Sequence, residues 1–163
     1  MITLKQINIY VDVFKANYKL TYPLNVMDIL QNMNGLLVVN INIRHPAILL
    51  NDNKIEIQMP SYVFNAKARL KDEILLLFAH FMMHMKDAKI YNNNPFYRKN
   101  LWQQEQEAAR LFVLVLLMPE YEFRDAIYKH EFNGETDMVK VASMFGVGVD
   151  IAMQRALMLG LVK

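Results

Sequence analysis

The first third of the chain changes from helical to strand periodicity. Within residues 4–18, apolar side chains recur at positions 7, 10, 11 and 14, which is the spacing of an amphipathic helix. Pro23 can begin a second helix, which we expect to end before Asn34-Gly35. Short β-branched runs follow and predict two or three strands, at 36–43, 47–51 and 54–59.

The rest of the chain predicts helices. Helical patterns cover about 66–86, 101–118 and 119–129, with loop signals at 92–95 and at Asn133-Gly134. The last segment, 137–160, predicts two short helices around Gly146-Val147-Gly148. We therefore expect one α+β domain over residues 1–163, mainly helical, with a small sheet and a C-terminal helical pair at 137–160.

Composition limits the chemistry that this fold can carry. The 163 residues are 54% hydrophobic, which predicts a packed fold, and the net charge of +2 gives no argument for nucleic-acid binding. The absence of cysteine excludes thiolate metal sites and a cysteine nucleophile, so a metal site would need His, Asp or Glu. No export signal or membrane-spanning run is evident, so we expect a cytoplasmic protein without a membrane partner.

Two of the four histidines have the spacing of metal ligands. His80 and His84 lie at i and i+4 of a predicted helix, so both rings would face one side. This is how a helix presents two nitrogens to one zinc ion, which then needs a third protein ligand. Glu105 shares the apolar face of the next long helix, whereas Glu107 lies on a different face with Arg110. We therefore prefer Glu105 as the third ligand.

The histidine pair also has a purely structural interpretation. Glu73 precedes His80 by seven residues and could form a salt bridge on the same face. Asp87 follows His84 by three residues and could accept a hydrogen bond from a ring N–H. The aromatic residues around the Asn-Pro loop either line a substrate cleft or cover the helix ends, and they include Tyr91, Tyr97 and Trp102.

Beyond these patterns, the chain resembles the ImmA/IrrE family of metallopeptidases, which occurs in bacteria and their mobile elements. The family helix Ala-His-Glu-Leu-Gly-His is similar to the segment Ala79–His84. The family helix Glu-x-Glu-Ala-x-x-Phe-Ala-x-x-Leu-Leu-Met-Pro is similar to Glu105–Pro119. The resemblance implies a zincin-like domain in which zinc is held by His80, His84 and one of the paired glutamates.

The departures from the family pattern affect catalysis. The catalytic glutamate of the family follows the first histidine, and here that position is Phe81. Phenylalanine cannot take a proton from zinc-bound water, and general acid–base catalysis contributes about 10²–10⁴-fold. The family glycine before the second histidine is Met83. No catalytic residue is therefore assigned.

Two functions follow from the resemblance. In the first, the chain is a pseudo-peptidase, with or without a metal, that regulates by binding a protein such as a helix-turn-helix repressor. In the second, it is an active zinc endopeptidase that uses another base, and Glu73, Asp87 and Glu107 are the available carboxylates. The last predicted helix offers Gln154 and Arg155 beside mostly apolar residues, which is a poor recognition surface, so we expect no direct nucleic-acid contact.

Overall fold

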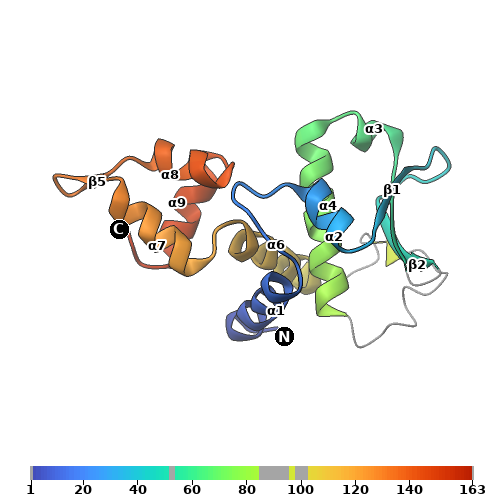
Figure 1. The fold of residues 1–163 in the computed structure, drawn as a ribbon, viewed down its shortest axis with the longest axis horizontal. Coiled ribbons are helices and arrows are strands. Elements are labelled where there is room, and N and C mark those ends of the chain that lie inside the picture. The colour runs from blue at the N-terminus through green and yellow to red at the C-terminus, as the bar shows by residue number, and fades with distance from the viewer. Residues whose placement is uncertain (1, 52–53, 85–95, 98–102, 163) are drawn as a thin grey trace.

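The structure is a computed structural model that describes residues 2–51, 54–84, 96–97 (backbone only) and 103–162. Helices predominate, and a small mixed sheet lies at one end of the molecule (Figure 1). The predicted mainly helical α+β class is confirmed. Within the described residues, no single helix is long and apolar enough to cross a membrane, and only the helix pair Met138–Phe145 and Val149–Met158, bent by 99°, reaches that length and composition together.

The N-terminal helices form where local caps support the apolar pattern. α1 (Leu4–Asn17) begins with a capping box between Thr3 and Gln6, and it buries Ile7, Val11 and Phe14. α2 (Val26–Asn32) begins later than predicted, because the Asn25 side chain, rather than Pro23, supplies the cap by accepting the N–H of Met27.

The sheet has the order β1-β3-β2-β4. β1 (Leu36–Val39) runs parallel to β3 (Lys54–Met59), while β2 (Ala47–Asn51) is antiparallel to both β3 and the two-residue β4 (Phe96–Tyr97). β1 is shorter than predicted because the Asn40 side chain accepts the N–H of Asn42 and turns the chain. β3 alternates as a half-buried strand should, and its buried positions are Ile55, Ile57 and Met59.

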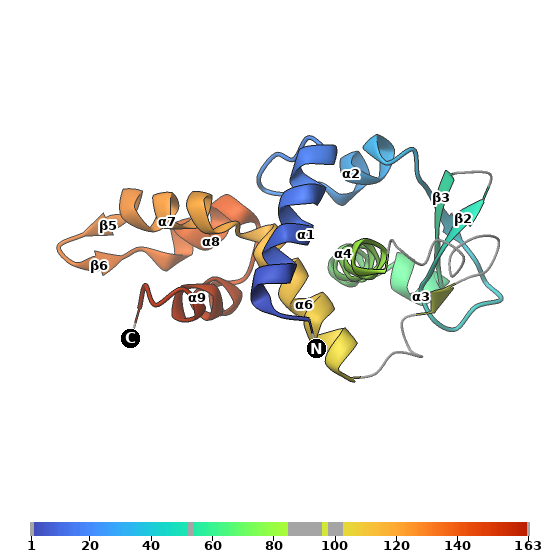
Figure 2. The same ribbon diagram turned by 90° about the horizontal axis from the view of Figure 1, so that it is seen from below.

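α4 (Lys67–Met83) is the central helix of the molecule. It follows the short α3 (Ser61–Phe64), and Figure 2 shows it nearly end-on, between the sheet on one side and α1 with α6 (Gln103–Leu117) on the other. Most of α4 is buried, including Ile74, Leu77, Phe78 and His80. A helix covered on several sides must be apolar around most of its circumference, which explains the run from Ile74 to Met83.

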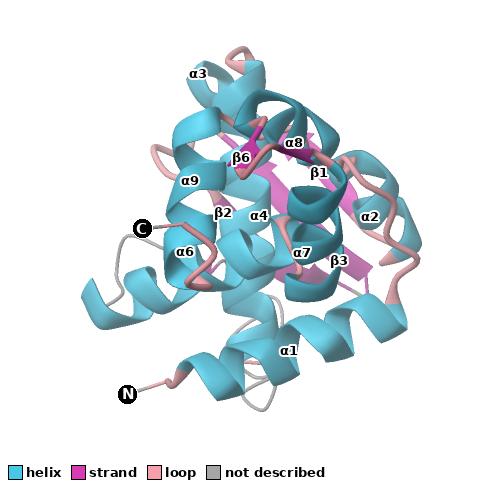
Figure 3. Cartoon of the chain, turned by 90° about the vertical axis from the view of Figure 1, so that its left-hand side faces the viewer, coloured by secondary structure: helices cyan, strands magenta, loops and turns pink. Residues whose placement is uncertain are grey.

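The C-terminal part contains more than the predicted helical pair. α7 (Glu120–Lys129), α8 (Met138–Phe145) and α9 (Val149–Met158) lie together at the end opposite the sheet, and Figure 3 views the molecule from that end. We predicted a simple break at Asn133-Gly134, but both residues have positive φ (54° and 81°) and form the turn of a hairpin between β5 (Glu131–Phe132) and β6 (Glu135–Thr136).

One hydrophobic cluster connects the C-terminal part to the rest of the molecule. It includes Phe14 of α1, Phe112 of α6 and Phe145 of α8. The Phe145 ring lies 5.7 Å from that of Phe123 and 5.8 Å from that of Tyr22, whose hydroxyl donates to the Leu116 carbonyl at 3.1 Å. Burial, and then the charge of Glu122, raise the pKa of the Tyr22 hydroxyl.

Candidate metal site

The two histidines lie on one side of α4 at its C-terminal end, as their spacing predicts. Their rings are 6.1 Å apart, centroid to centroid, and nearly parallel, with an angle of 17° between planes. His80 is fully buried, whereas His84, which caps the helix, retains 19% of its side-chain exposure. The backbone N–H of His84 donates to the His80 carbonyl at 3.0 Å, so the helical hydrogen bonding extends to the second histidine.

Glu105 lies opposite His84, in the first turn of α6. Its Oε1 is 4.0 Å from His84 Nε2, and 32% of the glutamate side chain is exposed. Glu105 therefore faces the histidine helix. Two ligand atoms of a tetrahedral zinc ion, each about 2.0–2.1 Å from the metal, are roughly 3.3 Å apart. His84 and Glu105 could occupy two such positions after a small side-chain movement.

The third position of a zinc site is not formed by the described residues. Within residues 2–51, 54–84 and 103–162, no three His, Asp or Glu side chains are grouped to hold a metal ion. His80 shares the helix face with His84, but it is the more deeply buried of the two. The described residues thus fit a zinc ion at two ligand positions, His84 and Glu105, and His80 is the nearest candidate in sequence for a third.

The positions between the two histidines are apolar and packed. Met82 and Met83 are buried, and Phe81 is half-buried against the hydrophobic cluster. In the family pattern the residue after the first histidine carries the carboxylate that handles the proton of zinc-bound water. Here the same helix position carries a phenyl ring that contributes to packing instead.

Two of the three alternative carboxylates, Glu73 and Glu107, can be placed relative to the histidine pair. Glu73 is buried on α4 but precedes His80 by seven residues, which is about 10 Å along a helix that rises about 1.5 Å per residue. Glu107 is exposed, accepts a hydrogen bond from Gln103 at 2.8 Å and lines a cleft whose lining residues include neither the two histidines nor Glu105. Asp87 lies outside the described residues.

The three aromatic candidates for a substrate cleft cannot be placed as side chains. Tyr91 and Trp102 lie outside the described residues. Tyr97 is described only as backbone, in β4, where it pairs with Ala47 of β2. The assignment of these residues to a cleft therefore stays a prediction.

A cleft that the sequence did not predict lies between α4, α6 and the end of α8 with α9. Its volume is about 660 Å³. The face of α6 that we separated from Glu105 lines it, with Glu107, Arg110, Leu111 and Leu114. On its α4 side, the pKa of Asp72 is raised overall. Burial is the largest cause, the charge of Lys71 lowers this pKa, and the charge of Glu73 raises it. The common periodicity of these α6 residues was the available signal, but only the tertiary arrangement shows that the face remains open.

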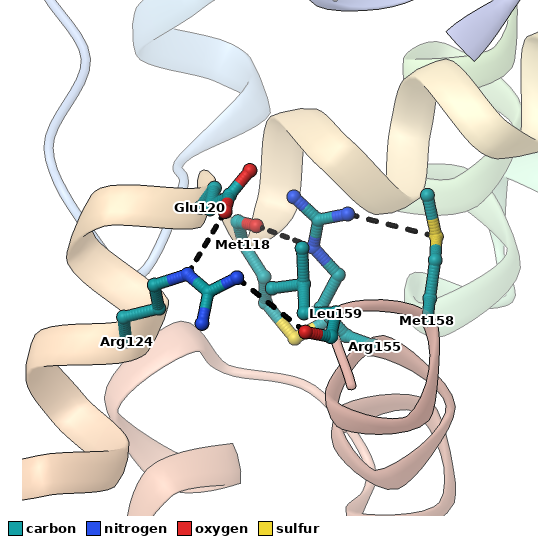
Figure 4. Close-up of polar contacts among 6 residues, drawn as sticks. All are labelled: Met118, Glu120, Arg124, Arg155, Met158 and Leu159. Atoms are coloured by element: carbon teal, nitrogen blue, oxygen red, sulfur yellow. Dashed lines mark hydrogen bonds and ion pairs between the residues drawn. The ribbon is translucent and has the colours of Figure 1, made fainter. Parts of the chain in front are cut away.

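Arg155 is the second feature that the sequence reading missed. We counted it, with Gln154, as a polar group that the last helix offers, but it is 2% exposed. Its Nε donates to the Met118 carbonyl at 2.9 Å, at the C-terminal end of α6 (Figure 4). The pKa of its guanidinium is lowered overall. Burial is the largest cause, the charge of Glu120 raises this pKa, and the charge of Arg124 lowers it. Its neighbours three and four positions away, including Ala152 and Leu159, are apolar, which was the signal for burial.

Comparison with known proteins gives no family for the chain. A scan against protein-family models finds no match, and a search of curated proteins finds none either. The family resemblance therefore depends on sequence segments alone, chiefly 79–84 and 105–119.

Proposed function

We propose that the chain is a degenerate metallopeptidase of the ImmA/IrrE type, a pseudo-peptidase that regulates by binding another protein. The partner we favour is a helix-turn-helix repressor in a bacterial or prophage-type context. The proposal is supported by the two motif segments, which lie on adjacent helices and place Glu105 opposite His84. A zinc ion at this position, held by His84, Glu105 and His80, would serve as a structural element.

The observation that carries the pseudo-peptidase part is the apolar residue at the position of the general base. Phe81 packs against the hydrophobic cluster, so the loss of the carboxylate is accompanied by local packing. Without a base beside the metal, hydrolysis loses a contribution of about 10²–10⁴-fold. A binding function, in contrast, needs no general base.

The alternative function, an active zinc-dependent endopeptidase, requires a base from elsewhere. Glu73 is about two helical turns from His80, and Glu107 lines the cleft between α4, α6 and α9, whose lining does not include the histidines. Asp87, outside the described residues, is the remaining carboxylate that we named. The positions of Glu73 and Glu107 favour the pseudo-peptidase over the enzyme.

Metal analysis of protein purified without chelators tests whether the proposed site of His80, His84 and Glu105 binds zinc. We expect about one zinc per chain in the wild type and its loss in His84→Ala, because His84 is a proposed ligand. His45→Ala is the matched control, since His45 lies in the segment before β2 and has no role in the site. Zinc that is retained in His84→Ala would exclude this metal site.

A cleavage assay then separates the binding protein from the enzyme. Wild-type protein with zinc should bind a cognate repressor without cleaving it. Phe81→Glu restores the carboxylate at the family position and should raise cleavage above the wild-type level wherever zinc is bound. Zinc-dependent cleavage by the wild type that stops in His80→Ala would overturn the pseudo-peptidase proposal.

A further inference from the structure

The cleft between α4, α6 and α9 lies on a different face of α6 from Glu105. For brevity we call it the α6–α9 cleft. Its floor is aliphatic, and all but one of the aliphatic residues are half-buried, so apolar surface remains open to water in a concave site. The half-buried residues are Leu76, Leu111, Val113, Leu114, Val147 and Ile151, and the buried one is Leu117. Open apolar surface gathered in one hollow is typical of a binding site.

The charges at the rim limit what can bind there. Lys71 and Asp72 lie on α4, and Glu107 and Arg110 lie on α6, so each helix supplies one cation and one anion. The rim therefore carries both signs in equal number. Such a rim is not complementary to a polyanion such as nucleic acid, which requires a basic surface. It is complementary to a segment that also carries charges of both signs beside an apolar face.

The shape of the cleft favours a helix over a small ligand. Along α6, the lining extends from Glu107 to Leu117, which corresponds to about 15 Å at about 1.5 Å per residue. A helix of about ten residues has the same length. Most of the lining residues are half-buried or exposed, so the cleft is an open groove along α6 rather than an enclosed cavity.

We infer that the α6–α9 cleft is a docking groove for an amphipathic helix of a protein partner. The docked helix would place aliphatic side chains, spaced i, i+3 or i+4 and i+7, against Leu111, Leu114 and Ile151. Acidic and basic residues beside that stripe would face the mixed rim. This inference rests on the proposed binding function and assigns it a surface separate from the histidine pair.

A designed peptide tests the groove directly. The probe is a fluorescently labelled 14-residue helical peptide with leucine at the stripe positions and glutamate and lysine in equal number elsewhere. We expect saturable binding in fluorescence anisotropy and amide NMR shifts concentrated in residues 107–117 and 146–154. A scrambled peptide of the same composition, which has no continuous apolar face, should bind at least about tenfold more weakly.

Substitutions on one helix give the matched control. Ile151 lines the cleft, whereas Leu157, also on α9, is 55% exposed and is not among the lining residues. Ile151→Lys should weaken binding at least about tenfold, and Leu157→Lys should leave it unchanged. Thermal melts of both variants check the fold, and if Ile151→Lys does not fold, Ile151→Ala replaces it, with a smaller loss expected in the same direction.

The inference is overturned if the peptide does not bind, if the shifts lie elsewhere, or if the Ile151 variants bind as the wild type does. Its failure can be distinguished from failure of the proposed function. If a repressor binds the wild type and Ile151→Lys equally well without being cleaved, the docking role of the α6–α9 cleft is refuted and the pseudo-peptidase proposal still holds. Zinc-dependent cleavage removes the pseudo-peptidase proposal and leaves the peptide result as it stands.

Discussion

Replacing Arg155 tests how the last helix is attached to the rest of the molecule. The guanidinium is buried, and its Nε donates to the carbonyl of Met118, a residue that is also fully buried. This carbonyl lies just beyond the last residue of α6, where the helix dipole places partial negative charge. Arg155 therefore joins α9 to the C-terminal end of α6 through a charge-assisted hydrogen bond.

The expected cost of Arg155→Ala follows from two contributions. Leaving the buried Met118 carbonyl without this donor costs about 1–3 kcal/mol. Removing the buried methylenes of the side chain costs about 0.8 kcal/mol for each, and the relief of burying a charge offsets part of that loss. Together these predict a decrease of about 3 kcal/mol in the free energy of unfolding, or roughly 6–12 °C in Tm for a chain of this length.

Chemical denaturation followed by circular dichroism measures the effect, and Arg124→Ala is the control. Arg124 lies in the same region (Figure 4), but 46% of its side chain is exposed, and its two contacts are open to water: an ion pair with Glu120 at 2.8 Å and a hydrogen bond to the Leu159 carbonyl at 3.4 Å. An exposed i, i+4 pair contributes about 0.3–0.5 kcal/mol, so this control should be nearly neutral. Equal losses in the two variants would contradict the attachment role.

A second variant separates the hydrogen bond from the packing. Arg155→Met keeps much of the apolar volume and removes both the donor and the charge. We expect it to be about 1–2 kcal/mol less stable than the wild type, which is less than the loss in Arg155→Ala. If Arg155→Met were as stable as the wild type, the buried charge would cost as much as its hydrogen bond contributes, and the reasoning would be refuted.

Two further substitutions test contacts between distant segments. Burial alone would raise the pKa of Glu122, but hydrogen bonds from Lys15 and from the backbone, together with the Lys15 charge, lower it below 4.5 overall. The stabilisation by this ion pair is therefore present above the unfolded-state pKa and is lost as pH falls through the folded-state value. Glu122→Gln should cost about 0.2–1 kcal/mol in urea denaturation at pH 7 and progressively less below pH 4, and a constant difference would contradict this account. Gly146 has a φ of 63° and a Cβ there would lie 2.8 Å from Cβ of Pro23, whereas Gly160 has a φ of 66° and no described atom within 4 Å of such a Cβ. Both alanine variants incur a left-handed backbone cost of about 1–2 kcal/mol, so a thermal melt should show Gly146→Ala as the less stable of the two, and equal melting temperatures would exclude the contact with Pro23 as a constraint.

Periodicity predicted the helices because the residues of each apolar face recur every three or four positions within one segment of the chain. The face of α6 with Glu107, Arg110, Leu111 and Leu114 was separated correctly from that of Glu105, and these four residues do line one cleft. The β5–β6 hairpin was missed because its strands have two residues each, too few for an alternating pattern to appear. That this α6 face is open, rather than covered, depends on where α9 lies, and no local pattern contains that information.

The metal site shows the same division between local and tertiary information. The spacing of His80 and His84 fixes their common helix face, because it depends on one helix alone. The approach of Glu105 to His84 joins two helices, and we expected it from the apolar face that Glu105 shares and from the resemblance to a family pattern. Convergence of three ligands requires in addition that His80, at 0% exposure, and the more accessible Glu105 reach one point, and sequence spacing cannot decide that.

α6 contributes to the candidate metal site, to the α6–α9 cleft and to the hydrogen bond with Arg155. Its first turn carries Glu105 opposite His84, its middle lines the α6–α9 cleft, and its C-terminal end accepts the hydrogen bond from Arg155. Because Arg155 holds α9, and α9 supplies Ile151 to the cleft, loss of Arg155 should loosen the cleft before it affects the first turn of α6. At a temperature where Arg155→Met remains folded, weaker binding of the helical peptide with unchanged zinc content would show that the two sites are mechanically separate. Loss of both together would show that α6 moves as one body.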